Sequence, residues 1–433
     1  MQNRNAILPS AGWHFLLVFI IIQSTPSTMR INKKYFLAFL LLCLSGAASA
    51  KQTQKTKKPL LQVIDSSLQK AIVQYKYMAA HLPANVLPKT YNPLNKKPET
   101  SNSGWWCSGF YPGSLLYLYE YSHDTALLHE SERVQKYLEK EQFNKGTHDL
   151  GFMMYCSFGN ANRLQPSKEY NEILMNSAKS LSTRFNPVVG CIKSWDHGTW
   201  KFPVIIDNMM NLELLFWATK NSGDSSFYKI AVTHANTTIK NHYRPDNSSF
   251  HVIDYDPATG NVNAKKTAQG YADYSAWARG QAWGLYGYVV MYRSTKDKKY
   301  LTQANKIADF IINHPNMTAD KIPYWDYNSP DIPATYRDAS AASIAASALV
   351  ELSKYTDAKK SETYLGFAEQ VIRALSSQVY TANYGENGGF ILKHSTGNLP
   401  GGTEVDVPLT YADYYYIESM LRYKALKGAG KNR

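Results

Sequence analysis

The feature that most constrains the fold of this chain is a long succession of amphipathic helical patterns with almost no strand pattern between them. Beyond residue 60, apolar residues recur at helical spacing over stretches of about 11–18 residues, separated by polar loops rich in Gly, Pro, Asn and Asp. We count about 12 such helices, mostly in pairs, with clear examples at 114–140, 171–185, 208–220, 224–243, 282–314, 340–354 and 362–378. Short strand patterns occur at 250–256 and 388–395.

Helix pairs of this kind build either an open solenoid or a closed ring. A solenoid carries a sequence repeat of fixed period, and this chain shows none. The helix at 340–354 is rich in small residues (SAASIAASAL), which allow close packing and suit an inner ring. We therefore expect an all-α fold in which about six helical hairpins close into a toroid, as a single domain over residues 51–433.

The N-terminus has the pattern of an export signal. Residues 29–50, MRINKKYFLAFLLLCLSGAASA, combine a basic start, an apolar stretch and a small-residue cleavage site. The apolar run WHFLLVFIII in the preceding 28 residues is too short to span a bilayer. We interpret residues 1–50 as a signal peptide with an over-long start, take Met29 as the true initiator, and expect cleavage after Ala50 and a periplasmic or secreted protein.

Composition narrows the classes of partner. The formal net charge of +13 suits polyanions, but no zinc-finger pattern, RNA-binding motif or long basic helix indicates a nucleic-acid partner. Three cysteines remain after cleavage, Cys107, Cys156 and Cys191, and we interpret them as small buried hydrophobes. No HExxH, CxxC or other metal-ligand spacing occurs, so we expect no metal and no other cofactor. We also expect no membrane contact once the signal peptide is cleaved.

Four segments at expected loop-to-helix junctions concentrate the residues that carry chemistry. They are SGWWCSGFYPGSL (103–115), GTHDLGF (146–152), SWDHGTWKFPVIIDNMMNLELLFWA (194–218) and QGYADYSAWARGQAWGLYG (269–287). Loops held by a rigid scaffold are where functional residues concentrate. Each segment also has a structural interpretation, namely a packed aromatic turn, a helix cap or a buried ion pair.

Two of these segments supply carboxylates and one supplies an arginine among tryptophans. Asp149 and Asp207 each stand at the start of an apolar helical run, where either is able to serve as an N-cap. Arg279 lies between Trp277 and Trp283, which fits a carboxylate clamp or a stacked cation better than core packing. Paired carboxylates among aromatic side chains are the components of glycoside chemistry.

Seven segments, in order over about residues 100–425, resemble glycoside hydrolase family 88, the unsaturated glucuronyl hydrolases. They are WCSGFYPG, HDLGF, DNMMNLELLFWA, HVIDYDPATG, SAWARGQAWGLYG, RDASAASIAASALVELS and YADYYYIESML. HDLGF, the DNMMNL stretch and RGQAWGLYG are specific in combination, although each alone is weak. The unsaturated rhamnogalacturonyl hydrolases of family 105 are the second resemblance.

The resemblance implies an (α/α)6 barrel and an unusual reaction. Enzymes of this family hydrate the C4–C5 double bond of an unsaturated uronic acid, which lyases leave at the non-reducing end of an oligosaccharide. A carboxylic acid protonates C4, water adds at C5, and the resulting hemiketal opens and releases the neighbouring sugar. By resemblance, Asp207 is the acid/base and Asp149 the second carboxylate. The implied substrate contacts are Trp106, His148, Trp195, His251, Gln269, Arg279 and Trp283.

These implied roles make physical demands on the site. Asp207 must be protonated near neutral pH, whereas a helix N-terminus favours the ionised form, so its pKa must be raised. Burial among aromatic side chains and the like charge of Asp149 are the candidate causes. We expect an ionised Asp149 within several ångströms, Arg279 on the substrate carboxylate or a ring hydroxyl, and Trp106 and Trp283 stacked on sugar faces.

Other parts of the pattern are looser. SWDHGTW, which contains Trp195, matches less closely than the other motifs, and Cys107 stands where the family pattern has Thr or Ser. Residues 393–396 lie in a late loop where they either contact the second sugar or form an ordinary hairpin.

The expected partners are unsaturated uronate-containing oligosaccharides derived from glycosaminoglycans. Unsaturated rhamnogalacturonan disaccharides and a non-catalytic sugar-binding barrel are the alternatives. The presence of the Asp149 and Asp207 pair with Arg279 argues against the binding-only alternative.

Overall fold

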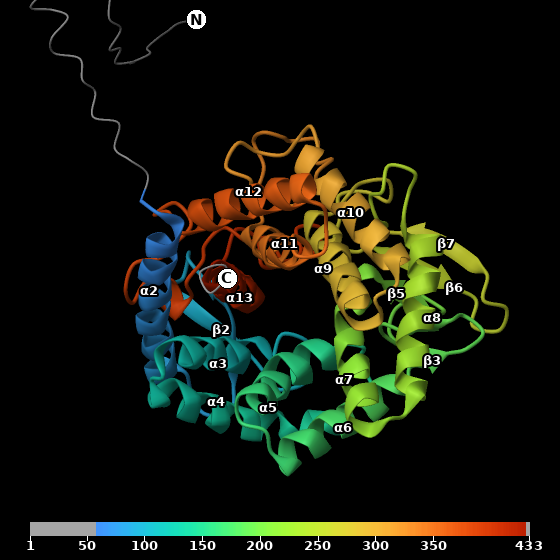
Figure 1. Cartoon of the computed structure of the whole chain (residues 1–433), viewed down its shortest axis with the longest axis horizontal. Helices are drawn as coiled ribbons and strands as arrows, with labels where there is room; N and C mark the ends of the chain where they lie inside the picture. The colour runs from blue at the N-terminus through green and yellow to red at the C-terminus, as the bar shows by residue number, and fades with distance from the viewer. Residues whose placement is uncertain (1–57, 430–433) are drawn as a thin grey trace, which may run out of the picture. The chain divides into compact units, whose positions relative to one another are not determined.

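Twelve α-helices in residues 58–429 alternate between an outer and an inner ring (Figure 1). The computed structural model describes residues 58–429, so the predicted signal peptide at 1–50 lies outside the described residues. The outer helices are α2 (Leu60–His81), α4 (Thr125–Leu138), α6 (Lys168–Ser182), α8 (Ser225–His242), α10 (Lys298–Asn313) and α12 (Ala358–Leu375). The inner helices are α3 (Phe110–Ser122), α5 (Asn160–Leu164), α7 (Leu212–Ser222), α9 (Ala278–Thr295), α11 (Ala339–Leu352) and α13 (Thr410–Ala429).

Burial separates the two rings in the way the sequence pattern predicts. Every residue of α11 is buried, and its small side chains let it pack against α9, α12 and α13. The outer helix α10 buries one face only, through residues such as Tyr300, Ala304 and Ile307. The predicted all-α toroid of helical hairpins is therefore confirmed. None of the helices in residues 58–429 is long and apolar enough to cross a membrane.

Aspartates set the starts of most outer helices. The side chains of Asp124, Asp224, Asp297 and Asp357 each accept a backbone N–H in the first turn of α4, α8, α10 and α12, respectively. These caps satisfy N–H groups that have no partner within the helix. The loop-to-helix boundaries are thus encoded locally, which explains why the sequence pattern finds them.

Short antiparallel strands form within the loops that connect the helices. β1 (Leu87–Asn92) pairs with β2 (Lys97–Ser101), and β3 (Phe185–Asn186) pairs with β4 (Cys191–Ile192). A three-stranded sheet has the order β5 (Pro203–Ile205), β6 (Val252–Tyr255), β7 (Val262–Lys266). The strand pattern at 250–256 is confirmed as β6, but the one at 388–395 is wrong, because that segment starts in a 3-10 helix (η4, Asn387–Gly389) and otherwise forms only isolated bridges.

Two segments of the inner ring are wound differently from an α-helix. η2 (Gly151–Gly159) is π-helical and leads into α5, and η3 (Ile206–Asn211) is a 3-10 helix that leads into α7. Gly109 lets α3 approach η2, because a Cβ there would lie 2.2 Å from the carbonyl oxygens of Phe152 and Met153. π-Helical turns are frequent at functional sites, and η2 begins two residues after Asp149 of GTHDLGF.

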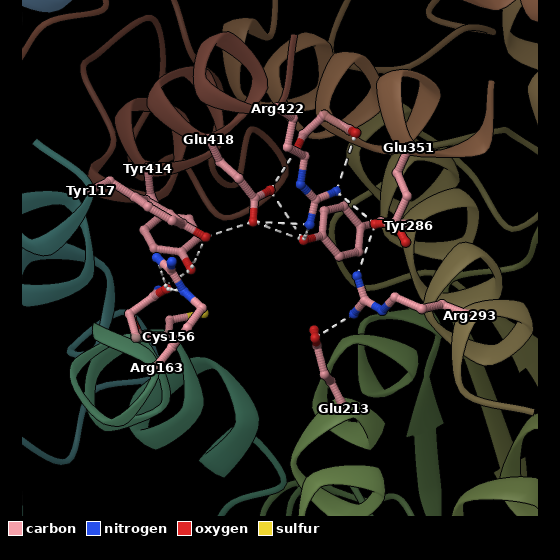
Figure 2. A network of polar contacts seen from close by, with 12 residues as sticks. Tyr117, Cys156, Arg163, Glu213, Tyr286, Arg293, Glu351, Tyr414, Glu418 and Arg422 are labelled. Carbon is pink, nitrogen blue, oxygen red and sulfur yellow. Dashed lines mark hydrogen bonds and ion pairs between the residues drawn. The ribbon is translucent and has the colours of Figure 1, made fainter. Parts of the chain in front are cut away.

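A charged network joins the inner helices towards their C-terminal ends (Figure 2). Glu418 of α13 accepts hydrogen bonds from Tyr117 of α3 at 2.8 Å and from Tyr286 of α9 at 3.0 Å. Arg422 and Arg293 both pair with Glu351 of α11, at 3.1 and 2.8 Å. All of these residues except Glu351 line a cavity of about 490 Å³, so this end of the barrel is held by ion pairs.

Candidate active site

The loops that precede the inner helices converge on a smaller cavity at the opposite end of the ring. Its volume is about 280 Å³, and segments before α3, η2, η3 and α9 contribute to it. Seven of the nine predicted site residues line it: Trp106, His148, Asp149, Trp195, Asp207, Gln269 and Arg279. Tertiary structure therefore gathers residues that lie up to 173 positions apart in the chain, from Trp106 to Arg279, into one pocket.

Asp207 has the properties that a proton donor needs. It lies in the first turn of η3, is 7% exposed, and its Oδ2 has no hydrogen-bond partner among the described residues. Burial raises the pKa of Asp207 to about 7, with the nearby Arg279 opposing this rise and the like charge of Asp149 adding to it. The predicted rise and both of its predicted causes are confirmed, with burial the larger.

Asp149 is not a helix cap. Its carboxylate accepts the Thr147 hydroxyl at 3.0 Å and lies 3.4 Å from Nε2 of His148. The carboxylate makes no capping bond to η2, where the residue before the first turn is Leu150. His148 and Asp149 therefore both line the cavity, and the Asp149 carboxylate is held by the Thr147 hydroxyl. This favours an active-site role for the motif over a helix cap.

His251 is held in one tautomer beside Asp207. Its Nδ1 accepts the backbone N–H groups of Ala268 and Gln269, both at 3.1 Å, so the ring proton must be on Nε2. Burial, aided by the positive charge of Arg279, lowers the pKa of His251 to about 3. The neutral ring thus points an N–H at Asp207, with Nε2 3.7 Å from Oδ2.

His148 is the second buried imidazole of the site. It is 3% exposed, and burial lowers its pKa while the charge of Asp149 opposes the change. Nδ1 of His148 has no hydrogen-bond partner among the described residues. A neutral His148 therefore keeps one ring nitrogen available at the cavity wall.

Arg279 is an ion-paired residue as well as a cavity-lining one. It is 1% exposed, pairs with Asp338 at 3.0 Å, and donates to the carbonyls of Thr396 and Gly397 at 2.7 and 2.5 Å. Its guanidinium also lies over the ring of Trp277, 4.5 Å from the centroid. Three of the five N–H donors of an arginine are used in this way, which leaves Nε and one further N–H for a ligand.

The three predicted tryptophans differ in exposure. Trp106 and Trp195 are half-buried and line the cavity, so each has ring surface available to a sugar. Trp283 is fully buried and packs against Phe152 at 4.9 Å and Tyr415 at 5.4 Å. The prediction that Trp283 stacks on a sugar face is therefore wrong, because its ring forms the aromatic floor beneath the cavity.

The late loop holds the site from behind. Gln269 donates to the carbonyl of Gly397 at 3.0 Å, the same oxygen that Arg279 uses. Of residues 393–396, Ser395 and Thr396 are 0% and 1% exposed, so the first alternative, a contact with the second sugar, is wrong for these two, whereas Lys393 and His394 are half-buried and that alternative stays a prediction for them. The backbone carbonyls of Thr396 and Gly397 instead hold Arg279, and the Gly397 carbonyl also holds Gln269.

Asp338 is a site residue that the sequence pattern did not predict, although it lies in the motif RDASAASIAASALVELS. Asp338 caps α11 through Ser340 and pairs with Arg279 in a fully buried position. The D-x-S pattern before a helix was a signal for the cap, but nothing in the sequence indicated the partner. Within residues 58–429, no group of three His, Cys, Asp or Glu side chains is arranged to hold a metal ion.

The cysteines behave largely as predicted. Cys107 and Cys191 are buried, Cys156 is half-buried, and all three are free thiols. Burial raises the pKa of each thiol well above its usual range, so none has the thiolate character of a nucleophile.

Comparison with known proteins places the chain among carbohydrate-active enzymes. No family model matches the chain. It is 47% identical over 346 residues to an unsaturated glucuronyl hydrolase of Formosa agariphila, covering 79% of this chain and 86% of the relative. It is 31% identical to an unsaturated chondroitin disaccharide hydrolase of Streptococcus agalactiae, covering 85% and 92%. A solved unsaturated glucuronyl hydrolase specific for heparin superposes with a TM-score of 0.83 at 48% identity, covering 85% and 98%.

Proposed function

The chain belongs to the unsaturated glucuronyl hydrolases of glycoside hydrolase family 88, and from this we propose how its cavity works. The substrate is an oligosaccharide that carries a 4,5-unsaturated uronic acid at its non-reducing end, as glycosaminoglycan lyases produce. The enzyme removes that sugar by hydrating its double bond. The observation that carries this proposal is the buried carboxyl of Asp207, which has a raised pKa and an unpartnered oxygen at the cavity wall.

The proposed reaction begins with proton transfer from Asp207 to C4. The electrons of the C4–C5 double bond form the new C–H bond, and the positive charge that develops at C5 is shared with the ring oxygen. A water molecule adds at C5 and gives a proton to the carboxylate of Asp207, which restores the carboxylic acid. The C5 hemiketal then opens to a ketone, the former ring oxygen takes up the proton, and the hemiacetal left at C1 releases the neighbouring sugar.

Asp149 and the two histidines support this step. The negative charge of Asp149 helps to keep Asp207 protonated and stabilises the positive charge that develops at C5. The N–H of His251 faces Asp207 and stabilises the carboxylate that forms after proton transfer. The two free donors of Arg279 suit the substrate carboxylate, and Trp106 and Trp195 offer ring faces for the sugar.

We propose unsaturated heparin-type disaccharides as the preferred substrates. The relative with 48% identity is specific for heparin, whereas the relative that hydrolyses unsaturated chondroitin disaccharides is 31% identical. Unsaturated chondroitin disaccharides are the second candidate, because a relative of lower identity is named for them. Unsaturated rhamnogalacturonan disaccharides remain as an outcome of the test.

The test compares four substrates and two matched variants. Residues 51–433 are mixed with unsaturated heparin, chondroitin, hyaluronan and rhamnogalacturonan disaccharides, and loss of the ultraviolet absorbance of the double bond is followed. Asp207→Asn should lower kcat about 10²–10⁴-fold. Asp413→Asn is the control, because Asp413 is also a buried carboxyl with a pKa of about 7 but binds the N–H groups of Ile391 and Leu392 instead.

The outcomes separate mechanism from substrate. Loss of absorbance with the heparin product, absent in Asp207→Asn and present in Asp413→Asn, supports the whole proposal. Loss with another disaccharide alone keeps the mechanism and changes the substrate. No loss with any substrate, together with saturable binding, would leave a sugar-binding barrel and overturn the proposed catalysis.

We also propose that the protein is exported and processed after Ala50. The support is the pattern of residues 29–50, with its basic start, apolar stretch and small-residue cleavage site. Mass spectrometry of the protein purified from its native cell envelope tests this. A mature N-terminus at Lys51 supports export, and an intact Met1 or Met29 in the cytoplasm contradicts it.

A further inference from the structure

The two carboxylic acids of the site stand on different inner segments that meet at one hydrogen bond. Asp149 immediately precedes Leu150 and η2, and Asp207 lies in the first turn of η3. The side-chain Oδ1 of Asn211 accepts the backbone N–H of Phe152 at 2.9 Å. Asn211 is four residues after Asp207, and Phe152 is three residues after Asp149, so this bond links the two segments within about one turn of each acid.

The Phe152 N–H needs a partner from outside its own helix. It is the second residue of η2, and the first N–H groups of a helix have no acceptor within it. Asn211 is fully buried and supplies that acceptor from the neighbouring segment. Loss of the Asn211 acceptor would leave the buried N–H of Phe152 without a hydrogen bond, which is costly. We expect η2 and η3 to shift relative to each other in response.

The fit between the two segments is also steric. A Cβ on Gly151 would lie 2.5 Å from Cα of Asn211 and 2.7 Å from its Oδ1. Only a glycine therefore lets η2 and η3 approach closely enough to form the bond. The glycine of HDLGF and the second asparagine of NMMN act as the two halves of one contact.

We propose that Asn211, seated against Gly151, is a positioning residue that sets the separation of the Asp149 and Asp207 carboxyl groups. This inference rests on the proposed function, in which those two acids act together. Proton transfer is sensitive to shifts of about 0.5–1 Å, so a contact within a turn of both acids has direct leverage on the reaction. Asn211 itself acts through the helices and not on the substrate.

The charge environment provides a readout of the separation. Asp149, His148, His197 and Arg279 line the cavity together with Asp207, and Nε2 of His251 lies 3.7 Å from Oδ2 of Asp207. Of these, Asp149 raises the pKa of Asp207 and Arg279 lowers it. If the contact between η2 and η3 loosens, the influence of Asp149 weakens and the pKa of Asp207 falls.

The experiment perturbs the contact from both sides. Asn211→Leu removes the acceptor at similar volume, and Gly151→Ala forces the segments apart. Each should lower kcat about 10–100-fold with KM changed less than about twofold, and the double variant should be no worse than the poorer single variant. Both should move the high-pH limb of the kcat profile to lower pH.

The matched control is Asn160→Leu. Asn160 is also a buried asparagine, at the start of the inner helix α5, but it donates to the Cys156 carbonyl at 2.9 Å and to the Tyr414 hydroxyl at 3.0 Å and does not line the active-site cavity. It should lower the melting temperature and leave kcat and its pH profile unchanged.

A titration without substrate keeps the inference testable even if the proposed function fails. Carboxyl ¹³C NMR of aspartate-labelled protein, with the Asp207 signal identified by its loss in Asp207→Asn, should show a lower Asp207 pKa in Asn211→Leu and Gly151→Ala than in wild type. The proposal is overturned if both variants keep the wild-type Asp207 titration, or if an active Asn211→Leu enzyme loses only melting temperature, as Asn160→Leu does.

Discussion

Nε2 of His251 lies 3.7 Å from Oδ2 of Asp207, and neither atom has a hydrogen-bond partner among the described residues. The separation is too long for a direct hydrogen bond, yet the tautomer of His251 directs its N–H into this gap. Both side chains are buried: Asp207 lines the cavity, and His251 lies behind it. The N–H of His251 is therefore placed beside the carboxyl group of Asp207, which becomes negatively charged only after it has donated its proton.

His251 should therefore stay neutral throughout the working pH range. Its pKa of about 3 lies well below neutral pH, because burial and Arg279 both disfavour the imidazolium. Imidazole ¹⁵N NMR should show an unprotonated Nδ1 and a protonated Nε2 from pH 5 to pH 8, with His251→Phe identifying the signal. Appearance of the imidazolium form within that range would contradict this prediction.

The activity should fall at high pH because Asp207 must carry a proton. With a pKa of about 7, the protonated fraction of Asp207 declines about tenfold per pH unit above neutrality. A plot of kcat/KM against pH for the free enzyme should show a high-pH limb near 7. A rate that stays level from pH 6 to pH 9 would mean that another group supplies the proton.

Asp207 should also cost stability at high pH. Its folded pKa of about 7 lies above the unfolded value of about 3.9, so its contribution is fully present below about pH 4 and is lost as the pH rises towards 7. Asp207→Asn removes the buried charge and should stabilise the fold by roughly 2–4 kcal/mol at pH 8 but not at pH 4. Melting temperatures at the two pH values measure this difference. Equal effects at both pH values would argue against the raised pKa.

Arg279 and Asp338 should behave as one unit. Breaking a buried pair leaves an uncompensated charge and typically costs about 3–5 kcal/mol, so Arg279→Met and Asp338→Asn should each lower the melting temperature strongly. The double variant should lose much less than the sum of the two single losses, because it leaves neither charge unpaired. Additive losses in this cycle would show that the 3.0 Å contact contributes little.

Two tryptophans should separate binding from stability. Trp195 is half-buried at the cavity, so Trp195→Ala should raise KM about tenfold with little change in melting temperature. Trp283 lies in the aromatic floor, so Trp283→Ala should cost about 3–5 kcal/mol of stability. Substrate kinetics and thermal unfolding of both variants measure this contrast. The opposite assignment of effects would restore the original expectation that Trp283 stacks on a sugar.

Local signals account for the part of this protein that its sequence predicts well. Four of the six outer helices begin where an Asp caps the first turn, and the small residues of 340–354 identify a helix that is buried on every side. The motif residues around Asp149, Asp207 and Arg279 stand at loop-to-helix junctions on one end of a ring of parallel inner helices. Once the chain closes into that ring, those junctions must face one another.

By itself, the sequence determined the helical barrel, the family and seven of the side chains that line the cavity. Tertiary structure alone decided what each of those side chains is able to do. Arg279 finds Asp338, and Asn211 finds Phe152, across 59 residues each, and no local pattern encodes such pairs. The burial that hides Trp283 and raises the pKa of Asp207 is likewise a property of packing from many segments at once, so it exists only in the closed ring.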